Sequence, residues 1–82
     1  MYKIIFTQRA INDLKHIDRG TQHRIAIKLK EYAKAPLRYA QKLVSPKIGM
    51  YRFRIGDYRI IFDLDEDNVV VLRIGHRKNI YK

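Results

Sequence analysis

Residues 51–62 read YRFRIGDYRIIF, and this stretch decides the fold. Two runs of aromatic, β-branched and charged residues flank Gly56 and Asp57, a pattern typical of two strands joined by a two-residue hairpin turn. Glycine at the first central position suits a type II′ turn, which needs a positive φ there. We therefore predict an antiparallel hairpin in which Ile55 pairs with Tyr58.

The register of this hairpin gives its two faces different chemistry. A two-residue turn sets Arg54 opposite Arg59, and side chains that lie opposite each other share a face. One face is apolar and is expected to be covered; it carries Tyr51, Phe53, Ile55, Tyr58, Ile60, Phe62 and Leu64. The other carries Arg52, Arg54 and Arg59. Like charges across a ladder destabilise it by up to roughly 1 kcal/mol per pair. We therefore favour a bound polyanion over an ordinary solvated sheet face as the reason for these arginines.

The sequence before the hairpin predicts a strand and two helices. Residues 2–6 form a β-branched and aromatic run, and Thr7 is a suitable N-cap for a helix that residues 18–20 end. Thr21 is expected to cap a second helix, which ends at Ala35 and Pro36. The predicted core-facing stripes are Ala10, Leu14 and Ile17 in the first helix, and Ile25, Leu29, Tyr32 and Ala33 in the second.

The remaining sequence predicts extended segments at residues 42–44, 58–64 and 69–75. A three-residue acidic turn would set Leu64 opposite Asn68, which places Leu72 and Ile74 on the covered face and Arg73 beside Arg59 on the open face. A four-residue turn would instead bury Arg73. The predicted fold class is α+β: one domain of residues 1–82, with an N-terminal strand and a two-helix hairpin on one face of a mostly antiparallel sheet of three to four strands.

The charge of the chain also indicates a polyanionic partner. It has 18 Lys and Arg against 8 Asp and Glu, a net charge of +10, and five of the eight acids fall within residues 57–67. Nucleic acid is the first candidate, because neutralising phosphates releases counterions, and a membrane surface is the second. No apolar run approaches the roughly 18 residues that span a bilayer, and the first residues do not resemble a signal peptide. The chain has no cysteine, which leaves its redox compartment undetermined, and the cytoplasm is the default expectation.

The segment from Gly75 to Tyr81 adds Arg77, Lys78 and a tyrosine at the end of the sheet face that carries the hairpin arginines. RNA cleavage by a 2′-hydroxyl needs a proton acceptor, positive charge at the phosphate and a proton for the leaving 5′-oxygen. A tyrosine ionises near pH 10 in water, and surrounding cations favour its ionised form. Arginines and a tyrosine could supply all three functions without a cofactor. Alternatively, Ile80 and Tyr81 simply pack the tail onto the sheet.

Other chemistries lack their residues. His16, His23 and His76 have no spacing typical of a metal site, so none is predicted. The acidic stretch at residues 63–67 lacks the glycine and distal glutamate of a calcium loop. The sequence contains neither a glycine-rich phosphate loop nor a nucleophilic serine elbow.

Residues 51–62 and the later segment VLRIGHRKNIY, residues 71–81, closely resemble the RelE/ParE superfamily of toxins from toxin–antitoxin modules. The resemblance implies a metal-independent, ribosome-dependent endoribonuclease that cuts mRNA in the ribosomal A site, leaving a 2′,3′-cyclic phosphate and a 5′-hydroxyl. It implies that Arg59 stabilises the phosphate, Arg77 protonates the leaving group and Tyr81 is the general base. Arg52 and Arg54 stand where RelE toxins have two lysines; with Arg73 and Lys78 they are the expected RNA-binding residues.

The resemblance also implies a cognate antitoxin that wraps a monomeric toxin into a hetero-oligomer. Two other activities stay open. One is a ParE-type poison of DNA gyrase with the same fold, against which the pair of Arg77 and Tyr81 argues. The other is a module that binds RNA or the ribosome without cutting.

Overall fold

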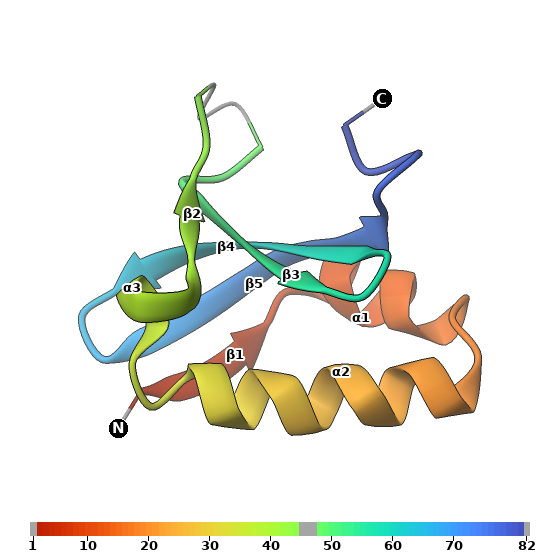
Figure 1. Cartoon of the computed structure of the whole chain (residues 1–82), viewed down its shortest axis with the longest axis horizontal. Helices are drawn as coiled ribbons and strands as arrows, with labels where there is room; N and C mark the ends of the chain where they lie inside the picture. The colour runs from red at the N-terminus through yellow and green to blue at the C-terminus, as the bar shows by residue number, and fades with distance from the viewer. Residues whose placement is uncertain (1, 45–47, 82) are drawn as a thin grey trace.

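The computed structural model describes residues 2–44 and 48–81, and its strands form one five-stranded sheet (Figure 1). The elements are β1 (Lys3–Phe6), α1 (Gln8–Lys15), α2 (Arg19–Tyr32), α3 (Pro36–Tyr39), β2 (Gln41–Lys42), β3 (Tyr51–Ile55), β4 (Tyr58–Asp65) and β5 (Asn68–His76). The strand order is β1-β5-β4-β3-β2, with β1 parallel to β5 and the other pairs antiparallel. The predicted α+β fold class is confirmed.

The β3–β4 hairpin has the predicted register. Ile55 pairs with Tyr58 and Arg54 with Arg59. Gly56 has a φ of 59°, and Asp57 is not among the residues with positive φ, as a type II′ turn requires. The hairpin therefore presents its arginines on the face opposite to its aromatic residues.

The prediction for the β4–β5 turn was wrong. The turn has two residues, Glu66 and Asp67, and pairs Asp65 with Asn68. A register shift between Ile61 and Phe62 then changes which β5 side chains face the helices. As a result Val69, Val71 and Ile74 are in the core, whereas the predicted Leu72 is not.

The N-cap of α1 is the predicted residue, but the N-cap of α2 is not. The Thr7 hydroxyl accepts a hydrogen bond from the Ala10 N–H, as expected for the N-cap of α1. However, α1 ends at Lys15, and Asp18 rather than Thr21 caps α2, because the Asp18 carboxylate accepts bonds from both the N–H and the hydroxyl of Thr21. The short helix α3 was not predicted. No helix among the described residues is long and apolar enough to cross a membrane.

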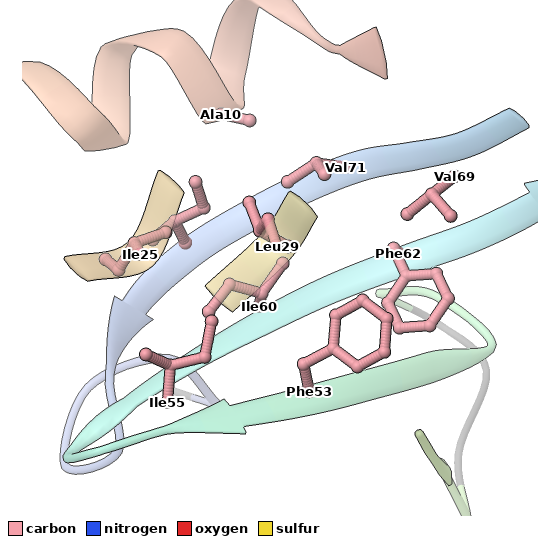
Figure 2. Packing of buried hydrophobic residues seen from close by; sticks show 10 residues of the cluster. Ala10, Ile25, Leu29, Phe53, Ile55, Ile60, Phe62, Val69 and Val71 are labelled. Carbon is pink, nitrogen blue, oxygen red and sulfur yellow. The ribbon is translucent and has the colours of Figure 1, made fainter. Parts of the chain in front are cut away.

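The core lies between α1, α2 and the apolar face of the sheet, on the side where Figure 1 shows α2 crossing the strands. The rings of Phe53 and Phe62 stack with centroids 4.2 Å apart, and Ile25 and Leu29 of α2 pack from the opposite side (Figure 2). The tail after β5 rises on the other side of the sheet (Figure 1). That uncovered side carries Arg52, Arg54 and Arg59 of the hairpin, and we call it the arginine face.

Candidate active site

Arg59 is the most enclosed charged residue of the arginine face. It lies at the start of β4 and is only 8% exposed. Its Nη1 donates hydrogen bonds to the carbonyl oxygens of Gly56 and Tyr58, each at 3.0 Å. Within residues 2–44 and 48–81, its other two nitrogens have no hydrogen-bond partner in the protein, yet no buried side-chain nitrogen is left unpaired. These nitrogens therefore reach solvent and can meet an anion.

The surroundings of Arg59 form a positive field. Burial lowers the pKa of Arg59 below its ordinary value, and the charges of Arg54, Arg52 and Arg77 lower it further, while Tyr81 acts in the opposite direction. A guanidinium stays protonated at physiological pH in any case. Burial is the main cause of the lowered pKa, and the smaller effects of the three arginines reflect nearby positive charge that a phosphate anion would compensate.

Arg52 links β3 to the C-terminal tail. Its Nη1 donates a hydrogen bond of 2.7 Å to the phenol oxygen of Tyr81, and its guanidinium carbon lies 5.8 Å from the centre of the tyrosine ring. The opposite edge of the guanidinium, Nε and Nη2, donates to Oε1 of Gln41 on β2 at 3.0 and 2.8 Å. The phenol is therefore held on the arginine face by a charged group.

The tail is docked by one buried residue. Ile80 is 2% exposed and packs against Gly75, while Tyr81 next to it is 46% exposed. The backbone N–H groups of Asn79 and Ile80 both donate to the His76 carbonyl, which closes a tight turn. Ile80 thus does pack the tail, but Tyr81 remains accessible with its oxygen toward Arg52.

Arg77 lies at the hairpin turn. Its backbone N–H donates to the Asp57 carbonyl at 2.8 Å, and its Nε lies 3.7 Å from Asp57 Oδ1 in an exposed ion pair. Such exposed pairs are weak, so the guanidinium is free to exchange partners. Arg54 is exposed opposite Arg59, and neither it nor Lys78 on the exposed tail has an ion pair among the described residues.

Arg73 lies on the predicted face of the sheet, opposite Ile61, but its guanidinium has a partner that was not predicted. Its Nε pairs with Asp13 of α1 at 3.1 Å, and the same carboxylate accepts the Ile74 N–H at 2.9 Å. β1 pairs with β5 only as far as Val71, so Asp13 covers the free edge beyond it and takes Arg73. Arg73 therefore stabilises the contact between α1 and β5, and Asp13 compensates its charge.

Sequence reasoning missed the partners that orient the arginines. Gln41 and Asp57 contact Arg52 and Arg77, and Arg24 of α2 reaches the Gly56 turn. A two-residue strand such as β2 has too few residues for a recognisable pattern, so nothing in the sequence marked Gln41. Asp57 could have been found, since it occupies the turn nearest the tail.

The arrangement has the groups for a phosphoryl transfer that uses fixed positive charge. It combines a buried guanidinium, two accessible guanidiniums and a phenol oxygen on one face. Within the described residues, no group of three or more His, Cys, Asp or Glu could hold a metal ion.

Comparison with known proteins identifies the family. The sequence model for the ParE toxin of type II toxin–antitoxin systems, parDE, matches residues 4–81. The chain belongs to the RelE/ParE superfamily of toxins.

Individual relatives agree with this assignment. Toxin RelE3 of Methanocaldococcus jannaschii is 32% identical over 83 residues, covering 96% of this chain and 94% of that protein. Toxin RelG of Mycobacterium tuberculosis is 32% identical over 88 residues, covering 99% and 97%. In the crystal structure of the RelBE2 toxin–antitoxin complex from M. tuberculosis, one chain superposes with a TM-score of 0.82 at 28% identity, covering 93% of this chain and 98% of that one. The RelE/ParE membership and RelE-like fold expected from residues 51–62 and 71–81 are therefore confirmed.

Proposed function

We propose that this RelE/ParE toxin is a ribosome-dependent endoribonuclease that inhibits translation by cleaving mRNA in the ribosomal A site. One observation carries the proposal. The phenol oxygen of Tyr81 is held 2.7 Å from Arg52, on the face where the enclosed Arg59 presents two nitrogens without a partner among the described residues. A proton acceptor and a cation suited to phosphate are thus on the same face.

The proposed reaction is an intramolecular phosphoryl transfer within the RNA. Tyr81, ionised, takes the proton of a 2′-hydroxyl, and that oxygen forms a bond to the adjacent phosphorus. Arg59 donates to the non-bridging oxygens, where negative charge develops. The bond to the 5′-oxygen breaks, and Arg77 supplies the proton that this alkoxide takes. The products are a 2′,3′-cyclic phosphate and a 5′-hydroxyl, and the mechanism needs no metal.

The remaining cations of the site are proposed to bind RNA. Arg52, Arg54 and Lys78 lie on or beside the arginine face and would contact the phosphates that flank the scissile one. Arginine suits this role because its planar fork donates two parallel hydrogen bonds to a phosphate.

The proposed partners are the ribosome with its mRNA and a cognate antitoxin. The RelBE2 relative was crystallised as a toxin–antitoxin complex, and the net charge of +10 favours an acidic inhibitor as well as RNA. We propose that the toxin is a cytoplasmic, single-domain monomer that becomes part of a hetero-oligomer with its antitoxin.

The test is cleavage of mRNA on programmed ribosomes, mapped by primer extension. Wild-type protein should cut within the A-site codon, and Arg59→Ala and Tyr81→Phe should each cut roughly a hundredfold more slowly while remaining folded by circular dichroism. Arg38→Ala and Tyr39→Phe are matched controls, since both residues are exposed on α3 and Tyr39 is 40% exposed. Equal rates in Tyr81→Phe and wild type would exclude the proposed base.

A ParE-type poison of DNA gyrase is the second candidate, because the matching family model is described by the ParE toxin. A supercoiling assay run beside the cleavage assay separates the two. Inhibited supercoiling with intact mRNA would favour the gyrase poison. Ribosome binding with neither effect would favour a module that binds without cutting.

A further inference from the structure

We propose that Gln41 is a positioning residue of the cleavage site: it fixes the guanidinium of Arg52, and Arg52 in turn holds the phenol of Tyr81. This inference rests on the proposed nuclease function. Gln41 lies on β2, opposite Arg52 and 40 residues before Tyr81 in the sequence, and it belongs to no motif of the chain.

The contacts define the orientation of Arg52 completely. Nε and Nη2 both donate to one oxygen, Oε1 of Gln41, at 3.0 and 2.8 Å, and Nη1 on the other side donates to the Tyr81 oxygen at 2.7 Å. A guanidinium has only donors, so the amide atom that faces it must be the oxygen. Because the group is planar, holding one edge also sets the direction of the opposite nitrogen.

The fold places this amide at the point where it is needed. β2 consists of Gln41 and Lys42 alone, and Gln41 is the direct cross-strand partner of Arg52. The Leu43 N–H donates to the Met50 carbonyl at 2.9 Å and continues the pairing. Arg52 would otherwise be a long side chain on a solvated face with many accessible rotamers.

The neutral side chain of Gln41 explains why the site has an amide here. Arg77 and Arg73 both pair with carboxylates, of Asp57 and Asp13, which compensate their charge. Gln41 instead accepts from two nitrogens of Arg52 and has no charge, so Arg52 keeps its full attraction for phosphate. Substitutions of Gln41 can therefore change the orientation of the Arg52 guanidinium and the compensation of its charge separately.

Two substitutions separate these properties. Gln41→Met removes the acceptor and leaves a side chain of similar length, whereas Gln41→Glu keeps the acceptor oxygens and compensates the charge of Arg52. Lys42→Met is the control, because Lys42 is the other residue of β2 and is also exposed.

The first measurement is made on the free protein, without RNA or ribosomes. Proton exchange of the Arg52 Nε–H, followed by NMR, should be at least about tenfold faster in Gln41→Met, because a solvated guanidinium proton loses its acceptor. Contacts between Arg52 and the Tyr81 ring should weaken as well. Gln41→Glu and Lys42→Met should resemble wild type. An unchanged exchange rate in Gln41→Met would overturn the inference.

The second measurement is mRNA cleavage on programmed ribosomes. Gln41→Met should lower kcat roughly three- to tenfold, as expected for one exposed hydrogen-bond network, with little change in KM. Gln41→Glu should preserve kcat but raise KM. In an Arg52→Ala background, Gln41→Met should cause no further loss, since it acts through Arg52.

The outcomes separate the inference from the proposed function. Wild-type protein that cleaves nothing would overturn both. Active wild type with a normal kcat in Gln41→Met, or with additive losses in the double variant, would overturn the positioning role alone.

Discussion

Gly75 determines whether the tail can dock beside Arg59. Gly75 and Arg59 are cross-strand partners in β5 and β4. The side chain of Ile80 occupies the space that a side chain at residue 75 would fill. A Cβ built at Gly75 would lie 2.9 Å from Ile80 Cδ1, closer than carbon atoms normally approach. A side chain at residue 75 would therefore force the Ile80 methyl to shift, and Tyr81 is the next residue along the tail.

We expect Gly75→Ala to displace the tail without unfolding the sheet. Overpacking of this kind costs about 1–3 kcal/mol, and the tail is the part free to move. Amide exchange at residues 78–81 should increase, and mRNA cleavage should fall at least about tenfold, because the base is no longer positioned. Gly20→Ala is the control, since its Cβ would make only an ordinary 3.4 Å contact with Asp18. Wild-type exchange and cleavage in Gly75→Ala would refute this role.

For single residues, the sequence predicted position and partners well only where neighbours along the chain determine them. Arg54 and Arg59 share a face because a two-residue turn leaves no other register. The ion pair of Arg73 was missed because its partner, Asp13, is 60 residues away and meets it only after α1 has packed on the edge of β5. Gln41 was missed for the same reason, since its role exists only in the assembled sheet.

Among the elements, α2 depends on a single charged cap. Hydrogen bonds from the Thr21 hydroxyl, and then from its backbone N–H, lower the pKa of Asp18 below its ordinary value of 3.8. A carboxylate whose folded pKa is lowered stabilises the fold above the unfolded pKa, and this contribution is lost as the pH falls through the folded pKa.

The variant Asp18→Asn tests this contribution, because asparagine caps a helix about as well as aspartate and lacks only the charge. We expect the variant to unfold at a lower temperature than wild type at pH 7. The difference should shrink as the pH falls below 3.8 and then vanish. A difference independent of pH would show that the charge of Asp18 does not contribute.

The β4–β5 connection shows that the sequence pattern predicts neither the length of a turn nor a register shift within a strand. Glu66 adopts a φ of 53°, a conformation unusual for a residue with a side chain, so composition gave no sign of a two-residue turn. The register shift between Ile61 and Phe62 then reverses the faces of β5 partway along the strand. Ile74 was nevertheless placed on the covered face correctly, because the shorter turn and the register shift have opposite effects on its orientation.

Across the whole molecule, the net charge of +10 is unevenly distributed, with a group of acidic residues near one turn and a group of arginines near another. Asp63, Asp65, Glu66 and Asp67 lie toward the β4–β5 turn, while the hairpin turn and the tail carry Arg54, Arg59 and Arg77. Repulsion among these arginines opposes folding, and a bound phosphate chain would relieve it.

This distribution predicts the salt dependence of RNA binding. Replacing Arg54 or Arg52 by Ala should make the slope of log K against log salt shallower by about 0.7, the value for one contact to a single-stranded phosphate. Arg38→Ala, on exposed α3, should leave the slope unchanged. Slopes equal to wild type in both arginine-face variants would mean that these residues do not contact phosphate.

The central claim is that Arg59 and Tyr81 act together on one RNA phosphate, and its most direct test is the chemistry of the cut ends. Purified protein would cleave mRNA on programmed ribosomes, and the new ends would be identified by enzymatic labelling and mass spectrometry. We expect a 2′,3′-cyclic phosphate and a 5′-hydroxyl, both lost in Tyr81→Phe. A 5′-phosphate with a 3′-hydroxyl, or unchanged cleavage in Tyr81→Phe, would contradict the claim.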